Sequence, residues 1–303
     1  MSEIPNLSES LVKRDGFAEV YPFPSRFLNA RGPRQHYIDE GHGSPLLFVH
    51  GNPTWSFIWR RFIRDFSDTH RTIAVDHVGC GLSDKPQNYT YDLATHVNNL
   101  CELIEHLDLT EITLVAHDWG GAIAMGAAIR QQPRIVRIAL MNTAAFRSRH
   151  MPLRIAACRI PLLGAIGVRG FNLFARAALS MAVHDGKSIT ADVATGLLAP
   201  YDNWRNRIAI HRFVQDIPLR ASHPSYATLM QIESELARLK HLPIALIWGM
   251  RDWCFTPHFL EEFERHFPEA ESTRIADAGH YVFEEAYEQT RDALKKLLSR
   301  KPS

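Results

Sequence analysis

The sequence has 303 residues, with 34 Lys and Arg against 33 Asp and Glu, so its formal net charge is only +1. That balance argues against a nucleic-acid-binding protein or a partnership driven by charge of one sign. Hydrophobic residues make up 46% of the chain, but no apolar run approaches the roughly 18 residues of a membrane span, and the polar N-terminus does not resemble a signal peptide, so we expect a cytoplasmic globular protein.

The elements predicted along the chain alternate between strands and helices. Residues 24–43 predict a β-hairpin with its turn at Arg31–Pro33. Short apolar runs without strict alternation, typical of parallel strands buried on both faces, occupy residues 45–51, 71–79, 112–121, 134–142, 242–250 and 271–279. Helical patterns lie at residues 97–109, 120–131 and 285–300. We therefore expect an α/β protein with a mostly parallel sheet flanked by helices.

The alternation stops between about Phe146 and Tyr226, where the pattern predicts helices only. We expect this segment to be a helical cap inserted into the α/β core. The predicted division is a first part of the core at residues 1–145, a cap at 146–226 and a second part of the core at 227–303. The four cysteines are far apart and form no CxxC motif, so we expect neither a metal nor a cofactor.

The strand–turn–helix pattern at residues 112–133 carries a carboxylate where hydrolases usually place a serine. A β-branched run ends at Ala116, Asp118 stands at the tip of the turn, and an alanine-rich helix follows. Taken alone, Asp118 would be interpreted as a helix N-cap. A carboxylate is already ionised at neutral pH, however, and can attack a saturated carbon without the help of a base. The product would be an alkyl ester of Asp118.

Two more residues with catalytic potential follow predicted strands. Asp252 comes after residues 242–250, and His280 comes after residues 271–279. Separately they would be a turn residue and a surface histidine. Because open α/β sheets carry their sites at the carboxyl ends of strands, we expect both to converge on Asp118. Their order along the chain predicts a triad in which His280 activates the water that hydrolyses the ester, and Asp252 holds the imidazole.

Two uncharged donors are expected beside the nucleophile. Trp119 offers an indole N–H and Asn52 an amide NH₂, so together they could bind a departing anion without pairing with Asp118 as an arginine would. Alone, Trp119 would be a core residue and Asn52 a turn residue before a proline. We also expect the backbone N–H groups of Trp119 and of the loop at residues 50–55, at Asn52, to form the oxyanion hole.

The stretches HGNPTWSFIWR, DHVGCGLSDKP, AHDWGG and DAGHY resemble the haloalkane dehalogenase family, over nearly the whole chain. The resemblance implies an α/β-hydrolase fold with a helical cap inserted after the sixth strand. It also implies Asp118 as nucleophile, His280 as base, and Asn52 and Trp119 as halide donors. In members of the family, the acid of the triad follows either the sixth or the seventh strand. The sixth-strand position is Asn142 in this sequence, so the resemblance implies that Asp252, after the seventh strand, is the acid. This arrangement is that of the third subfamily.

The segments at residues 169–178 and 198–219 also resemble β-lactone decarboxylases of bacterial long-chain olefin biosynthesis. That resemblance implies the same Asp, His and Asp acting on a strained lactone, with a carboxylate as leaving group and an alkene and CO₂ as products. The residues near the chemistry do not separate the two reactions. The Asn52–Trp119 pair places dehalogenation first by a small margin, on a hydrophobic small-molecule substrate.

Two further functions are less favoured. Epoxide hydrolases also use an elbow aspartate, but they need two cap tyrosines, and only Tyr201 and Tyr226 lie in or near the cap. A binding module of the same fold would have lost a member of the triad, whereas all three are present.

From Trp119 to His184 the sequence contains no Asp or Glu. It contains nine arginines, at positions 130, 134, 137, 147, 149, 154, 159, 169 and 176. One interpretation is a set of cap helices that face an apolar pocket, with the arginines solvated outside. The other is a basic, apolar docking surface for a membrane or a partner protein, through which hydrophobic substrates arrive.

Overall fold

The computed structural model describes residues 12, 14–29 and 32–301. Its centre is an eight-stranded sheet with the spatial order β1-β2-β4-β3-β5-β6-β7-β8, in which β3 to β8 are parallel. β1 and β2 form the expected antiparallel hairpin, and Arg31 of its predicted turn lies outside the described residues. The strands are β1 (Arg26–Leu28), β2 (Gln35–Glu40), β3 (Pro45–Val49), β4 (Arg71–Val75), β5 (Ile112–Asp118), β6 (Ile135–Thr143), β7 (Ile244–Gly249) and β8 (Glu271–Ile275).

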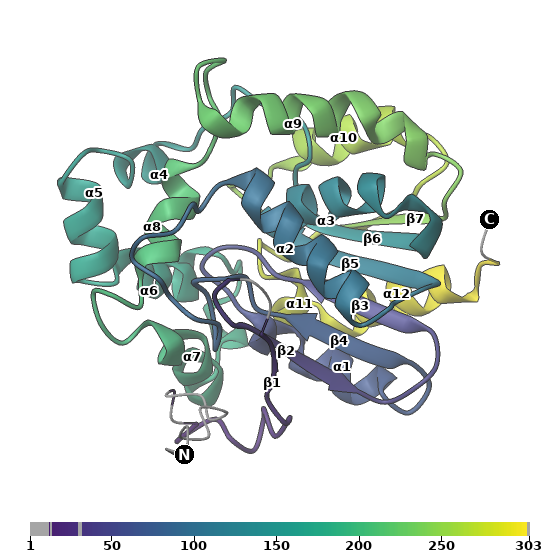
Figure 1. The fold of residues 1–303 in the computed structure, drawn as a ribbon, viewed down its shortest axis with the longest axis horizontal. Helices are drawn as coiled ribbons and strands as arrows, with labels where there is room; N and C mark the ends of the chain where they lie inside the picture. Colours follow the sequence, from purple (N-terminus) through teal and green to yellow (C-terminus); the bar gives the residue numbers. More distant parts are fainter. Residues whose placement is uncertain (1–11, 13, 30–31, 302–303) are drawn as a thin grey trace, which may run out of the picture.

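Helices cover both faces of the sheet (Figure 1). The core helices are α1 (Arg60–Phe66), α2 (Leu93–His106), α3 (Trp119–Arg130), α9 (Pro224–Glu235), α10 (Pro257–His266), α11 (Val282–Glu285) and α12 (Tyr287–Ser299). The C-terminal helix expected at residues 285–300 is α12, and the short helix α11 precedes it, separated from it at Ala286. Short 3₁₀ turns are η1 (Ser56–Trp59), η2 (Gln132–Arg134) and η6 (Leu236–Leu239).

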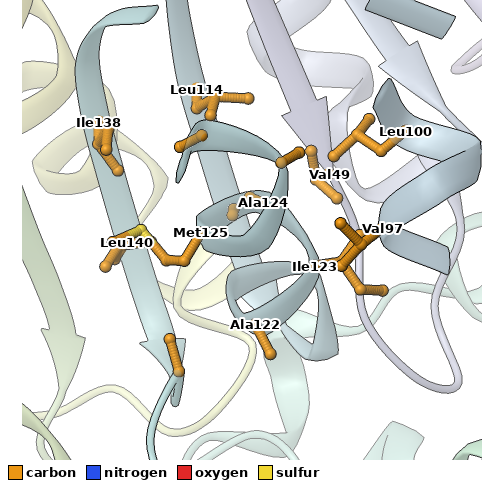
Figure 2. Packing of buried hydrophobic residues seen from close by; sticks show 14 of the residues in the cluster. Val49, Val97, Leu100, Leu114, Ala122, Ile123, Ala124, Met125, Ile138 and Leu140 are labelled. Carbon is orange, nitrogen blue, oxygen red and sulfur yellow. The ribbon is translucent and has the colours of Figure 1, made fainter. Parts of the chain in front are cut away.

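The parallel strands are apolar throughout because successive side chains enter opposite cores. Leu47 and Val49 belong to one buried cluster and Leu46 and Phe48 to the other. Figure 2 shows the first cluster, where α3 lies between the sheet and α2. Side chains of β3, β5 and β6 meet α3 and α2 there at Val49, Leu114, Ile138, Leu140, Ala122, Ile123, Ala124, Met125, Val97 and Leu100. The small residues of α3 let that helix approach both neighbours closely.

Between β6 and β7 the chain is helical, as expected. The elements are α4 (Leu153–Ala157), α5 (Leu163–Ala165), a π-helical turn η3 (Ile166–Gly170), α6 (Leu173–Met181), η4 (Gly186–Ser188), α7 (Ala191–Leu198), η5 (Ala199–Tyr201) and α8 (Ile208–Gln215). They gather at one end of the molecule, whereas the next helix, α9, packs on α2 and α3 of the core (Figure 1). We call residues 146–226 the cap and keep the division of the chain at these boundaries as a proposal. Among the described helices, none has the length and apolarity to cross a membrane.

Candidate active site

Asp118 stands at a sharp turn between β5 and α3. Its backbone has φ +53° and ψ −130°, a conformation that L-residues rarely adopt. The turn is secured by Thr143, whose hydroxyl donates to the Asp118 carbonyl. It also needs glycine at Gly51 and Gly120, because a Cβ at the first would collide with the Asp118 carboxylate and one at the second with the backbone of β3. Asp118 holds the N-cap position of α3, but its side chain makes no N-capping hydrogen bond.

The two oxygens of the Asp118 carboxylate have different surroundings. Oδ1 accepts a 2.6 Å hydrogen bond from the backbone N–H of Asn52, and the backbone N–H of Trp119 also donates to this carboxylate. Oδ2 lies 3.7 Å from Nε2 of His280. Burial raises the pKa of Asp118, and the His280 charge and the two N–H groups oppose that rise only in part. One oxygen is thus held by backbone donors while the other faces the imidazole.

His280 is oriented by Asp252, as the sequence predicts for a catalytic pair. Nδ1 of His280 lies 2.8 Å from Oδ2 of Asp252, and the imidazole stacks on the ring of Phe255 at a centroid distance of 5.5 Å. Burial lowers the pKa of His280, but the charge and hydrogen bond of Asp252, helped by Asp118, outweigh burial and raise it overall. Both residues are buried, at 8% exposure for His280 and 3% for Asp252.

Asn142 holds Asp252, a role that the sequence did not indicate. Its Nδ2 donates to Oδ2 of Asp252 at 2.9 Å, and its Oδ1 accepts the backbone N–H of Gly249. The backbone N–H of Cys254 donates to the other carboxylate oxygen at 2.7 Å. In the sequence, Asn142 marks only a strand end at which an acid is missing. The structure makes it a positioning residue for Asp252, the acid that follows β7.

We predict that Asn142→Ala lowers kcat about tenfold to a hundredfold, because a hydrogen bond to a buried carboxylate is lost and Asp252 gains freedom to turn away from His280. Steady-state kinetics would measure the effect, with Asn99→Ala as a control for loss of an amide that bonds only to Tyr89. An unchanged kcat in Asn142→Ala, with an unchanged melting temperature, would contradict the positioning role.

Asn52 and Trp119 both line the cavity beside Asp118, but their side chains are engaged differently. Nδ2 of Asn52 donates to the carbonyl of Ile210 in α8 at 3.2 Å, and its Oδ1 is buried without a partner in the described part of the chain. The indole of Trp119 packs near Phe213, and its N–H makes no hydrogen bond to any described residue. Trp119 is therefore a free donor, whereas one hydrogen of the Asn52 amide already binds the cap.

These residues lie in a cavity of about 560 Å³ between the core and the cap. Its size is within the range of small-molecule sites, about 300–1,000 Å³. Apolar side chains line most of it, including Phe146, Phe174, Met181, Val214 and Phe255. Neither Tyr201 nor Tyr226 is among the lining residues, so the two cap tyrosines that an epoxide hydrolase would need do not face Asp118, and the tyrosine that lines the cavity, Tyr281, comes from the core. Among the described residues no cluster of ligands suited to a metal ion occurs.

The chain matches the family model for the alpha/beta hydrolase fold over residues 44–159 and 186–287. It is 40% identical to the cis-3-alkyl-4-alkyloxetan-2-one decarboxylase of Shewanella oneidensis over 92% of this chain and 90% of that protein. It is 31% identical to haloalkane dehalogenase 2 of Mycobacterium bovis over 91% of this chain and 95% of that protein. A crystal structure of a mutant of the haloalkane dehalogenase DatA from Agrobacterium tumefaciens superposes with a TM-score of 0.82 at 26% identity, covering 91% of this chain and 96% of that one.

Proposed function

Because the chain belongs to the alpha/beta hydrolase fold family, and to the branch that joins haloalkane dehalogenases with β-lactone decarboxylases, we propose that it decarboxylates cis-dialkyl β-lactones to alkenes. The observation that carries this choice is the identity of 40% to a decarboxylase over nine-tenths of both chains, against 31% to a dehalogenase.

The first step of the proposed reaction opens the lactone ring. Oδ2 of Asp118 attacks the ring carbon that carries the oxygen, from the side opposite that oxygen. The bond between this carbon and the ring oxygen breaks, and its electron pair leaves with the oxygen as a carboxylate. Oδ1 becomes the ester carbonyl oxygen in the cradle of the Asn52 and Trp119 N–H groups. The indole N–H of Trp119 then donates to the new carboxylate.

The second step releases both products and restores Asp118. The bond to the carboxylate carbon breaks, its electron pair forms the alkene, and the Asp118 ester bond breaks so that its pair returns to Oδ2. CO₂ and the alkene leave, and neither water nor a proton is consumed. Because Asp118 attacks from the side opposite the ring oxygen, that carbon is inverted, and the ester oxygen lies anti to the carboxylate that leaves as CO₂. A cis-substituted lactone therefore yields a cis alkene without rotation.

Haloalkane dehalogenation is the second candidate, and the placement of Asn52 and Trp119 on the cavity wall favours it. Oδ2 of Asp118 would displace the halide from a saturated carbon. His280 would then take a proton from a water that attacks the carbonyl carbon Cγ of the ester; the bond between Cγ and Oδ2 breaks, and the alcohol leaves with Oδ2. Nε2 of His280 lies 3.7 Å from Oδ2, a spacing that allows a water to enter beside the ester. The same carboxylate serves both reactions, and they differ in whether water takes part.

We predict that the purified protein, given a cis-dialkyl β-lactone and a 1-bromoalkane of similar length in parallel, releases alkene at least about a hundredfold faster than bromide. Gas chromatography would measure the alkene and a colorimetric halide assay the bromide. Bromide release without alkene would reverse the order of the two candidates, and Asp118→Asn would serve as the control for reaction outside the site.

A further inference from the structure

The cap exposes a cluster of large apolar side chains that the site does not use. Seven of the ten exposed large hydrophobic residues in the described chain lie within the short segment 153–173. They are Leu153 (86% exposed), Ile160, Leu162 (78%), Leu163, Ile166, Phe171 and Leu173, which we call the cap patch. Monomeric proteins rarely leave so many large apolar groups together in water, so such a patch marks an interaction surface.

The cap patch is continuous. The N–H of Gly164 donates to the carbonyl of Ile160 at 2.8 Å, and a Cβ at Gly164 would collide with the carbonyl of Cys158, so α5 begins close against the end of α4. η3 packs against both α5 and α6, so the exposed side chains of these elements lie on neighbouring turns. α4, α5 and α6 form one end of the molecule (Figure 1). The patch therefore occupies a single region of the surface.

The arginines of the acid-free stretch divide into two groups. Six have polar partners that fix them in the fold: Arg134 and Arg147 pair with acids, Arg130 bonds an amide, and Arg137, Arg159 and Arg169 bind backbone carbonyls. The remaining three, Arg149, Arg154 and Arg176, are exposed and make no ion pair with any described residue. These three arginines lie beside or within segment 153–173, which carries the cap patch. The charges at the patch that have no partner of opposite sign are therefore positive.

The cavity opens beside the cap patch. Leu173 is 56% exposed as a patch residue and also lines the cavity. The exposed Arg154 lines the cavity too, stacked over Trp253 at 5.5 Å. A molecule that lies against the patch is thus at the entrance to Asp118. The entrance is apolar and bordered by cations.

We propose that the cap patch docks on an anionic phospholipid bilayer and draws alkyl substrates from it into the cavity. Leu153, Leu162, Leu163 and Phe171 enter the acyl–headgroup boundary, while Arg149, Arg154 and Arg176 bind lipid phosphates. Nothing acidic between Trp119 and His184 opposes that contact. The substrate half of the proposal rests on the proposed function, because a dialkyl lactone partitions into lipid. The proposal that the protein docks on a bilayer depends only on the exposed residues of the cap patch and on the three arginines.

The test of docking uses the full chain without substrate. Vesicles of phosphatidylcholine, with or without about 30% phosphatidylglycerol, are floated with the protein at low and high salt. We expect binding only to the anionic vesicles, weakened by salt. Leu163→Asp/Phe171→Asp should weaken it at least about tenfold, because two inserted side chains become charged. Met230→Asp is the control, because Met230 is an exposed apolar residue (44%) on α9 outside the cap patch, and this variant should bind as the wild type does.

A second pair of variants tests the charges. Arg149→Gln/Arg176→Gln should weaken binding to anionic vesicles about twentyfold to thirtyfold, since each basic side chain near such a surface adds about fivefold. Lys240→Gln/Lys295→Gln removes the same charge from core elements and should have little effect. Binding to anionic vesicles that does not weaken with salt would overturn the proposal. So would an equal loss of binding in the arginine pair and the lysine pair. So would a concentration-dependent dimer that Leu163→Asp/Phe171→Asp dissociates, because the patch would then join two copies of the chain.

The link to catalysis has its own readout. None of Leu163, Phe171, Arg149 and Arg176 lines the cavity, so these variants should turn over a short, water-soluble lactone at the wild-type rate. With a long-chain lactone in anionic vesicles, they should lose most of the wild-type rate. Vesicle binding without any lactone turnover would leave docking in place and refute the proposed function. Equal rates of wild type and variants on the vesicle-borne lactone would overturn the route through the patch.

Discussion

Asp118→Asn is expected to lower turnover by on the order of 10⁴-fold or more, with either a β-lactone or a bromoalkane, while the protein stays folded. An amide is a poor nucleophile, and no other carboxylate can replace Asp118, because Asp252 is occupied by His280, Asn142 and the Cys254 N–H. Steady-state kinetics with each substrate measure the loss. Residual activity above about 1% would contradict the assignment of Asp118 as nucleophile.

The same substitution should raise the melting temperature at pH 8. Burial raises the pKa of Asp118, so the fold favours its neutral form. A raised pKa contributes stability below the unfolded value, and that contribution is lost as the pH rises through the folded value. At pH 8 the ionised carboxylate therefore costs stability that a neutral asparagine of the same shape does not. Asparagine also tolerates the φ of +53°. A lower melting temperature at pH 8 would contradict this account.

Local patterns were sufficient to predict the core. The strands are short aliphatic runs because both faces of the parallel sheet are buried, and that signal is local to each run. The same logic placed Asp118, Asp252 and His280 together, since each follows a strand and the carboxyl ends of parallel strands share one edge of the sheet. The structure brings these three side chains within reach of one another. Their roles in turnover remain for the variants to test.

Contacts between distant segments were beyond the sequence patterns. The bond from Asn142 to Asp252 joins the ends of β6 and β7, 110 residues apart. The bond from the Asn52 amide to the Ile210 carbonyl joins the β3 loop to the cap across 158 residues. Asn142 and Asn52 carry no local signal for these partners. The same holds for the nine arginines between Trp119 and His184. Which of them lack an acidic partner depends on the side chains that the fold brings close to each one.

The triad of Asp118, His280 and Asp252 does not choose between lactone and halide, because both reactions displace a group from saturated carbon and both produce an anion beside Trp119. The similarity over nine-tenths of the chain favours the lactone, since the identity is 40% to the decarboxylase and 31% to the dehalogenase. The two mechanisms differ at one step that can be observed. Dehalogenation needs water to release Asp118, whereas decarboxylation does not.

His280→Ala is therefore expected to have opposite consequences for the two substrates. With a 1-bromoalkane, the variant should form the ester on Oδ2 of Asp118 and stop, because no base activates water, and turnover should fall by on the order of 10³-fold or more. Intact mass should rise by one alkyl group per chain, and peptide analysis should place that group on Asp118. With the β-lactone, turnover should slow but continue, and no adduct should accumulate.

Oxygen-18 water gives the same distinction in the unmodified protein. Water that hydrolyses an ester attacks the carbonyl carbon of Asp118, so repeated dehalogenation leaves heavy oxygen in that carboxylate. Decarboxylation breaks the bond between Oδ2 and the substrate carbon, so both original oxygens stay in place after any number of turnovers. We expect label in the Asp118 peptide after bromoalkane turnover and none after lactone turnover, as measured by mass spectrometry. Label acquired during lactone turnover would show that water enters the cycle, and the elimination step would then be wrong.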